Sequence, residues 1–317
     1  MAKALLDSAV SALGLLLLAI PAAGQSTLWD EVERGYAENG DVRIHYATVG
    51  EGPLVVMIHG FPDFWYSWRE QMEGLKGDFQ VAAIDQRGYN RSSQPDGIEA
   101  YDMSLLVEDV VAVVRHLGRD RATIVGHDWG GVVAWNVAFS HPDLVENLVI
   151  LDLPHPTSMQ RAWRTNPEAL AATEYARVFR AGTPDDPQVF FGMPMTPQTL
   201  SGWVRDPDAR AKYVEAFERS SFDGMLAYYK RNYPDLWSDE GSAGALAPTD
   251  VPQVQAPTLV FHGLEDQALH SDGLNNTWDW IDRDLTLVTV PDAGHFVQQD
   301  AAEDVPDTIQ SMRKMQS

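Results

Sequence analysis

A strand, a tight turn and a helix follow one another directly around residue 128, and this segment restricts the fold more than any other. The apolar run from Ala122 to Val125 is typical of a buried strand, and a helical apolar run begins at the glycines of residues 130–131. Between them, residues 126–130 read Gly-His-Asp-Trp-Gly, a variant of the G-x-S-x-G turn that exposes a nucleophile. Glycine suits both ends of so sharp a turn, because a side chain would collide with the neighbouring strand or helix. The pattern predicts a strand–turn–helix unit that presents Asp128 at the carboxyl edge of a sheet.

An aspartate at the centre of this turn points to a particular chemistry. Asp128 stands just before a helix N-terminus, where the helix dipole favours an anion. A carboxylate can attack a saturated carbon directly, without a base to activate it. Asp128 therefore favours epoxides or alkyl halides as substrates over esters and amides.

Strand patterns and helix patterns alternate along most of the chain. Residues 42–48 alternate between apolar and polar side chains, which is typical of an antiparallel strand. Residues 105–117 carry a largely apolar stripe at helical spacing, which Gly118 ends. Short continuous apolar runs at residues 54–58 and 81–84 are typical of parallel strands buried on both faces. Further strand-like runs follow at residues 148–151, 257–261 and 285–290. The alternation predicts an α/β fold with a doubly wound, mostly parallel sheet.

The alternation stops between residues 154 and 248, and this stretch predicts an inserted helical cap. It is rich in Pro, Trp, Tyr, Phe and Arg, with helical patterns at residues 206–219 and 223–232. We therefore divide the core into residues 25–153 and 249–317, and expect the cap to exclude water and shape the pocket. Its aromatic residues favour an apolar aryl or alkyl substrate: Phe179, Phe190, Phe191, Trp203, Phe217, Tyr229 and Trp237.

Composition excludes several classes of partner and cofactor. The 317 residues suit one large α/β domain with an insertion, and the net charge of −23 disfavours nucleic acid and anionic membranes as partners. There is no cysteine, no H-E-x-x-H motif and no phosphate-binding glycine pattern. Expecting no tight His/Asp cluster either, we predict neither a metal nor an organic cofactor.

Residues 1–24 have the pattern of a secretory signal peptide. Lys3 precedes an apolar core at residues 13–20, and residues 21–24 (Pro-Ala-Ala-Gly) offer small side chains for cleavage. The uncharged run from Ser8 to Ala23 is 16 residues long, short of the ~20 that span a bilayer. An uncleaved anchor or a plain leading helix is the alternative. We expect an exported protein, periplasmic or secreted, with no stable membrane insertion after cleavage; a homodimer is left open.

Two further residues complete a catalytic set in the second part of the core. Asp266 follows the predicted strand at 257–261, and His295 follows the strand at 285–290. Ligands of open α/β sheets gather where loops leave the carboxyl ends of strands, so both side chains are expected near Asp128. The order nucleophile, acid, histidine is that of the α/β-hydrolase fold, with aspartate in place of serine.

A turn after the strand at 54–58 predicts an oxyanion hole. Residues 59–62 read His-Gly-Phe-Pro. A turn at this place commonly supplies one backbone N–H to an oxyanion, and the residue after the nucleophile supplies the other. Here these would be the N–H groups of Phe61 and Trp129, aimed at the Asp128 side-chain oxygen that becomes negative when an ester on it is hydrolysed.

Together these motifs resemble the epoxide hydrolases of the α/β-hydrolase superfamily. The resemblance rests on residues 59–62, 126–131, 263–266 and 294–295, and it extends over about residues 30–315. It implies two cap tyrosines whose hydroxyls protonate the epoxide oxygen as the ring opens. Two segments resemble those that carry the tyrosines, around Tyr175 and around Tyr229; simple packing of either ring, or a role for Tyr228 instead, is the alternative.

The resemblance also implies a mechanism in two steps without a cofactor. Asp128 opens the epoxide at carbon while Tyr175 and Tyr229 stabilise the alkoxide, which leaves a hydroxyalkyl ester. His295 then removes a proton from the water that attacks this ester, and Asp266 orients the imidazole. The products are a vicinal diol and free Asp128.

Three alternatives stay open at this point. Asp152 lies at the end of the strand entering the cap, where haloalkane dehalogenases keep the acid that partners the histidine. Haloalkanes are the second substrate class, because Trp129 with a cap tryptophan such as Trp163 or Trp203 could bind a halide. A non-catalytic binding protein on this scaffold is the third.

Overall fold

The computed structural model describes residues 27–236 and 251–316. A single, mostly parallel sheet lies at the centre of this part of the chain. The predicted leader at residues 1–24 lies outside these ranges. So do residues 237–248 of the predicted cap, Trp237 among them.

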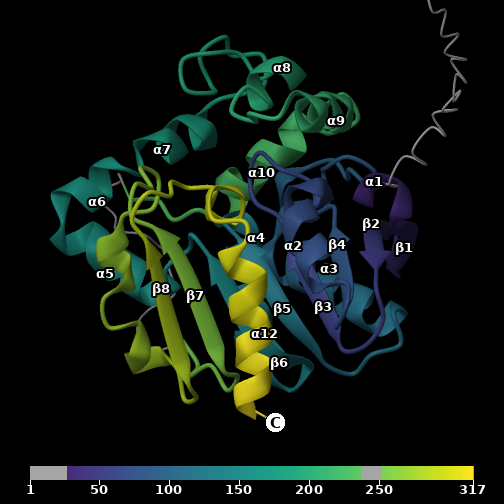
Figure 1. Cartoon of the computed structure of the whole chain (residues 1–317). Coiled ribbons are helices and arrows are strands. Elements are labelled where there is room, and N and C mark those ends of the chain that lie inside the picture. The colour runs from purple at the N-terminus through teal and green to yellow at the C-terminus, as the bar shows by residue number, and fades with distance from the viewer. Residues whose placement is uncertain (1–26, 237–250, 317) are drawn as a thin grey trace, which may run out of the picture.

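Within the described residues, eight strands form a single sheet in the order β1-β2-β4-β3-β5-β6-β7-β8 (Figure 1). Strands β3 to β8 run parallel, whereas β2 is antiparallel to both of its neighbours, β1 and β4. This confirms the predicted doubly wound, mostly parallel sheet. The strands are β1 (Glu33–Asn39), β2 (Val42–Val49), β3 (Leu54–Ile58), β4 (Gln80–Ile84), β5 (Ala122–His127), β6 (Val145–Leu151), β7 (Thr258–Gly263) and β8 (Leu285–Val290).

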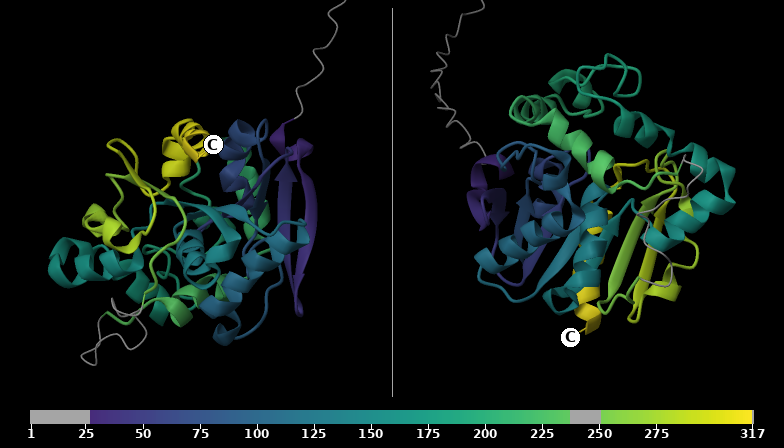
Figure 2. Two further views of the ribbon diagram at one scale, coloured as in Figure 1. Left: turned by 90° about the horizontal axis from the view of Figure 1, so that it is seen from below. Right: turned by 180° about the vertical axis from the view of Figure 1, so that it is seen from behind.

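Helices cover both faces of the sheet, which explains the continuous apolar runs of its central strands. Every residue of β3 and β5 is buried. Helices α2 (Arg69–Leu75) and α12 (Asp304–Gln316) pack together on one face, and α3 (Met103–His116) and α4 (Trp129–Ser140) on the other (Figure 2). The predicted helix at 105–117 is thereby confirmed as α3. Two short helices, α1 (Leu28–Glu31) and α11 (Val297–Asp300), complete the core.

The edge strand β1 was not predicted from the sequence. Its residues, Glu-Arg-Gly-Tyr-Ala-Glu-Asn, carry few β-branched or apolar side chains, and only Ala37 is buried. Pairing with β2, rather than burial of an apolar face, accounts for this strand.

Within the described residues, six helices lie between β6 and β7, on the side of the carboxyl edge of the sheet (Figure 1). They are α5 (Pro156–Thr165), α6 (Pro167–Ala171), α7 (Glu174–Ala181), α8 (Pro197–Leu200), α9 (Pro207–Phe217) and α10 (Phe222–Asn232). The helical patterns predicted at 206–219 and 223–232 correspond to α9 and α10. We call this layer the cap.

Helix α10 attaches the cap to the core. The Tyr228 hydroxyl donates to the Arg87 carbonyl at 2.9 Å, and the Asn232 amide donates to the Tyr101 carbonyl at 2.8 Å. At the start of the helix, the Ser221 N–H donates to the Gly88 carbonyl at 2.9 Å. Side chains on α10 are therefore held at a defined position relative to the sheet.

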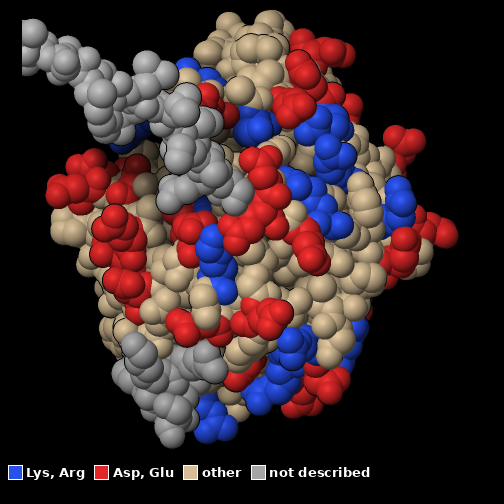
Figure 3. Space-filling model, turned by 45° about the vertical axis from the view of Figure 1, so that its right-hand side comes forward, with Lys and Arg blue, Asp and Glu red and all other residues tan. Residues whose placement is uncertain are grey.

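Acidic and basic side chains are interspersed on the face shown in Figure 3, within a chain whose net charge is −23. Among the helices of the described residues, none combines the length and the apolar character needed to cross a bilayer.

Candidate active site

Asp128 occupies a strained turn between β5 and α4. Its φ of +50° and ψ of −121° are unusual for a residue with a side chain and cost about 1–3 kcal/mol. The flanking glycines make the turn possible, because a Cβ on Gly126 would overlap the Gly130 carbonyl and a Cβ on Gly130 would overlap the Ile58 carbonyl. The surrounding strands thus hold the Asp128 carboxylate at the carboxyl edge of the sheet.

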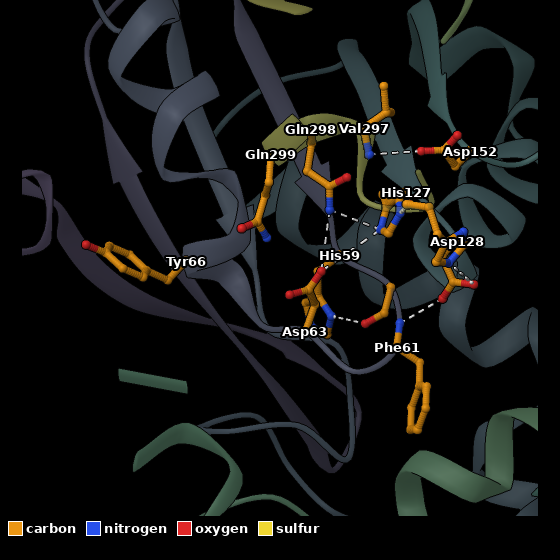
Figure 4. Close-up of polar contacts among 12 residues, drawn as sticks. His59, Phe61, Asp63, Tyr66, His127, Asp128, Asp152, Val297, Gln298 and Gln299 are labelled. Carbon is orange, nitrogen blue, oxygen red and sulfur yellow. Dashed lines mark hydrogen bonds and ion pairs between the residues drawn. The ribbon is translucent and has the colours of Figure 1, made fainter. Parts of the chain in front are cut away.

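The two carboxylate oxygens of Asp128 have different partners. Oδ1 accepts the Phe61 N–H at 2.7 Å, and Oδ2 lies 3.5 Å from Nε2 of His295 (Figure 4). Burial alone would raise the pKa of Asp128, but His295 and the Phe61 N–H bring it below its ordinary value. Asp128 is therefore ionised at neutral pH.

The predicted oxyanion turn lies directly against Asp128. A side chain on Gly60 would collide with the Asp128 carboxylate, so glycine is needed for this close approach. For the Trp129 N–H, no hydrogen bond to this carboxylate occurs among the described residues. The indole ring of Trp129 packs edge-on against Tyr229, with ring centroids 5.0 Å apart.

His295 stands between two carboxylates. Its Nδ1–H donates to Oδ2 of Asp266 at 2.9 Å, while its Nε2 faces Asp128. Burial would lower the pKa of His295, but Asp266 and Asp128 raise it well above its ordinary value. The imidazole is consequently protonated when both carboxylates are charged.

Of the two candidate acids, Asp266 rather than Asp152 faces the histidine. Oδ1 of Asp266 accepts the N–H groups of Ala268 and Leu269 at 2.8 and 3.0 Å, which leaves Oδ2 for His295. Burial would raise the pKa of Asp266, but the charge and hydrogen bond of His295 lower it below its ordinary value. The Asp152 carboxyl group accepts backbone N–H groups instead.

A buried polar network behind the site was not predicted from the sequence. His127 donates from Nε2 to the backbone carbonyl of His295 at 2.6 Å, and its Nδ1 accepts the Gln298 amide at 3.2 Å (Figure 4). Burial lowers the pKa of His127 to about 4, so this ring is neutral at neutral pH and keeps one tautomer. The nucleophile strand β5 is thereby joined to the backbone of His295 and to α11.

The same network reaches the cap through Asp63. This fully buried carboxyl accepts the Tyr213 hydroxyl of α9 at 2.6 Å and the Gln298 amide at 3.5 Å. Burial raises the pKa of Asp63 well above its ordinary value. The one signal available in the sequence was the short spacing of Asp63 from the predicted oxyanion turn.

Tyr175 and Tyr229 both line the cavity above Asp128. They come from α7 and α10, and their ring centroids lie 6.2 Å apart at an angle of 84°. Burial, together with the Asp128 charge, raises the pKa of Tyr229 well above 10, so its hydroxyl keeps its proton. Tyr228 points away, because its hydroxyl is bound to the Arg87 carbonyl.

The cavity has a volume of about 930 Å³ and a largely aromatic wall. Phe61 is one of the lining residues, and its ring contacts those of Phe179, Phe190 and Tyr229 at centroid distances of 5.3, 6.0 and 5.5 Å. Trp203 also lines the cavity and stacks on Phe296 at 3.7 Å. The residues around the cavity do not include Trp129, Trp163 or Phe217. Cavity and carboxylate together suit attack by Asp128 on an apolar electrophile.

A cluster of Asp152, His262 and Asp266 corrects one expectation from the sequence, which was that no tight His/Asp cluster forms. Ligand-type atoms of the three residues lie within 4.8 Å of one another. They meet because β6 and β7 are neighbours in the sheet, which sequence spacing does not reveal. The carboxyl oxygens of both aspartates already accept N–H groups.

Comparison with known proteins agrees with this geometry. Residues 53–302 match the alpha/beta hydrolase fold family. Epoxide hydrolase 2 of Caenorhabditis elegans is 33% identical over 82% of this chain and 74% of that protein, and epoxide hydrolase 3 of Xenopus tropicalis is 28% identical over 89% and 78%. The solved structure of a Bacillus megaterium epoxide hydrolase with an inhibitor superposes with a TM-score of 0.77, at 27% identity over 88% of this chain and 100% of that one.

Proposed function

This chain belongs to the epoxide hydrolases of the alpha/beta hydrolase fold, and on that premise we propose that it opens an apolar epoxide through a covalent ester on Asp128. One observation carries the proposal: Oδ1 of Asp128 accepts the Phe61 N–H and Oδ2 is next to His295, while Asp128 lines one cavity with Tyr175 and Tyr229. The product is a vicinal diol.

In the first step, Oδ2 of Asp128 forms a bond to an epoxide carbon and the carbon–oxygen bond of the ring breaks. The electron pair goes to the departing oxygen, which receives a proton from Tyr175 or Tyr229. A tyrosinate in this buried site is unfavourable, since burial raises the pKa of both hydroxyls.

Formation of the ester changes the charge around His295. Asp128 loses its negative charge, so one of the two carboxylates that raise the pKa of His295 is removed. The proton on His295 can then pass to the tyrosinate, which restores the tyrosine hydroxyl. The neutral imidazole that remains is the base required for the second step.

In the second step, His295 takes a proton from water, and the resulting hydroxide attacks the Asp128 carbonyl carbon. Negative charge develops on Oδ1, which the Phe61 N–H already contacts; the Trp129 N–H is proposed as the second donor. The bond between the carbonyl carbon and the substrate oxygen breaks, and the departing alkoxide takes the proton of the new carboxyl group. The diol then leaves, Asp128 is a carboxylate again and His295 remains protonated as at the start. Asp266 orients the imidazole through the bond to Nδ1.

Two adjacent tyrosines provide a matched test with styrene oxide as substrate. We expect Tyr229→Phe to lower the rate of ester formation about 100-fold, because a proton donor to the epoxide oxygen is lost. The control Tyr228→Phe removes a hydroxyl bound to the Arg87 carbonyl, so it should cost about 1 kcal/mol of stability and leave that rate unchanged.

Asp128→Ala should form no diol, and bromide release from 1-bromobutane should be measured alongside. Bromide release without diol formation, insensitive to Tyr229→Phe, would instead make the chain a dehalogenase. If the wild type shows neither diol formation nor bromide release, a non-catalytic binding protein is favoured instead.

We propose an epoxide with an aryl group as the substrate class. Phe61, Phe179 and Phe190 form an apolar wall beside Asp128, and a Bacillus megaterium relative of 27% identity was solved with a naphthyloxy-propane-1,2-diol product. Styrene oxide should therefore have a higher kcat/KM than 1,2-epoxybutane. Equal values would reject an aryl preference.

Export of the protein is also a proposal. The pattern at residues 1–24 supports cleavage before Gln25. Protein recovered from the periplasm or medium should begin at residue 25 by N-terminal sequencing. An intact Met1 in membrane-bound protein would support an uncleaved anchor.

The oligomeric state is a separate question, and light scattering would distinguish a monomer from a dimer.

A further inference from the structure

Asp152 is fully buried, and neither of the two proposed chemical steps uses its side chain. It follows the last residue of β6 and has a φ of +44°, in the left-handed region that disfavours side chains. Its backbone N–H donates to the Phe261 carbonyl at 2.9 Å and so continues the pairing of β6 with β7. Its side chain therefore enters the space between the loops that leave the sheet.

The carboxyl group of Asp152 bridges the two loops that carry Asp266 and His295. Oδ1 accepts the N–H of Gly263 at 2.8 Å, three residues before Asp266. Oδ2 accepts the N–H of Val297 at 3.0 Å, two residues after His295 (Figure 4). One buried group thus connects the last residue of β7, before Asp266, to the first residue of α11, after His295.

The bridge needs two acceptors. Both oxygens of a carboxyl group can accept an N–H, whereas an asparagine amide offers one oxygen and places an NH₂ donor opposite the second N–H. Burial and the nearby Asp266 raise the pKa of Asp152 well above its ordinary value, which leaves the negative charge of the pair on Asp266. Oδ1 of Asp152 lies 3.5 Å from Nδ1 of His262.

We propose that Asp152 is a positioning residue: by bridging Gly263 and Val297 it sets the geometry of the Asp266–His295 pair, and through it the rate of ester hydrolysis. This inference rests on the proposed two-step function. Ester formation uses Asp128 and the cap tyrosines, none of which hydrogen-bonds to Asp152 among the described residues. The two steps should therefore respond differently to changes at Asp152.

Quenched-flow kinetics of the full chain with styrene oxide separates the steps. In Asp152→Asn, we expect ester formation to stay within about twofold of the wild-type rate and hydrolysis to slow about 10- to 100-fold, as loss of alignment by an ångström typically does. Mass spectrometry should show the ester accumulating on Asp128. A residue with a purely structural role would slow both steps, or neither.

A matched control changes the same residue type at the end of α11, five residues after His295. Asp300 accepts one N–H, that of Gly294 at 3.0 Å, from an exposed position, and an asparagine oxygen can replace it there. Asp300→Asn should leave both rates within about twofold.

A second variant covers the possibility that Asp152→Asn does not fold. Val297→Pro removes the N–H donor from the other side of the bridge, at the first residue of α11, where proline is tolerated. It should also slow hydrolysis selectively. Unchanged hydrolysis in the folded variants overturns the role of Asp152, whereas a wild type that forms no ester from epoxides overturns the proposed function and this inference with it.

Discussion

In the proposed mechanism Asp128 serves two steps, and each of its two carboxylate oxygens has its own surroundings. Oδ1 is held by the Phe61 N–H at 2.7 Å, so it is the oxygen prepared for negative charge during hydrolysis. Oδ2 faces His295 and the cavity, so it is the oxygen free to attack. That the residue is an aspartate predicts attack on a saturated carbon. Its neighbours determine which oxygen attacks and which one carries the negative charge during hydrolysis.

His295 leads to a prediction about pH at the same scale. Burial would lower its pKa, but Asp266 and Asp128 raise it well above 6.5 in the free enzyme; the ester removes the Asp128 charge, so the pKa falls. Because hydrolysis needs a neutral imidazole, its rate should rise with pH through this lowered pKa and then level off. Ester formation should stay flat across neutral pH, because the pKa of Asp128 lies below its ordinary value.

Single-turnover measurements at several pH values check both statements, with His295→Gln as the control that retains the ester. A pH dependence of ester formation that matches that of hydrolysis would show that a neutral His295 is also needed for ring opening.

At the scale of elements, a short turn in the cap stands out by its strain. Phe190 and Met193 exchange backbone hydrogen bonds at 2.8 and 2.9 Å around Phe191 and Gly192, whose φ values are +49° and +79°. Glycine suits such a turn, whereas a phenylalanine there is strained. The Phe191 side chain is 63% exposed yet lines the cavity and contacts the ring of Tyr175 at 5.9 Å.

We predict that Phe191 lowers the stability of the protein through its strained backbone and that its side chain strengthens substrate binding. Phe191→Gly should relieve about 1 kcal/mol of backbone strain, seen as unchanged or raised stability in urea, while KM for styrene oxide rises several-fold. Met193→Ala, at an unstrained position of the same turn, is the control for lost apolar surface. An unchanged KM in Phe191→Gly would remove this side chain from substrate binding.

Elements also differ in how far the sequence predicts them. The buried strands and α3 were predicted because continuous apolar runs and helical stripes are local patterns. Strand β1 was missed, since its residues are polar and it exists through pairing with β2. In the cap, α9 and α10 were predicted from periodicity, but Tyr175 on α7 was singled out only by resemblance to a family.

At the scale of the whole molecule, the charge of −23 predicts a dependence of stability on salt. Like charges repel one another in the compact state, and at about 0.15 M ionic strength they are screened beyond about 8 Å. Raising sodium chloride from low concentration to this level should therefore raise Tm, with uncharged sucrose as the control for solvent effects. A fall in Tm would mean that attractive ion pairs outweigh the repulsion.

Local sequence patterns were sufficient to predict three local units: a strand–turn–helix with Asp128, a glycine turn before Phe61, and loops carrying Asp266 and His295. Each depends on a few neighbouring residues, so a local pattern suffices. Only the tertiary structure decided which acid faces the histidine, which of two adjacent tyrosines lines the cavity, and how His127 and Asp63 join the loops. These depend on how segments far apart in the chain are placed by the sheet, because hydrogen bonds act over about 3 Å and sequence spacing carries no such distances.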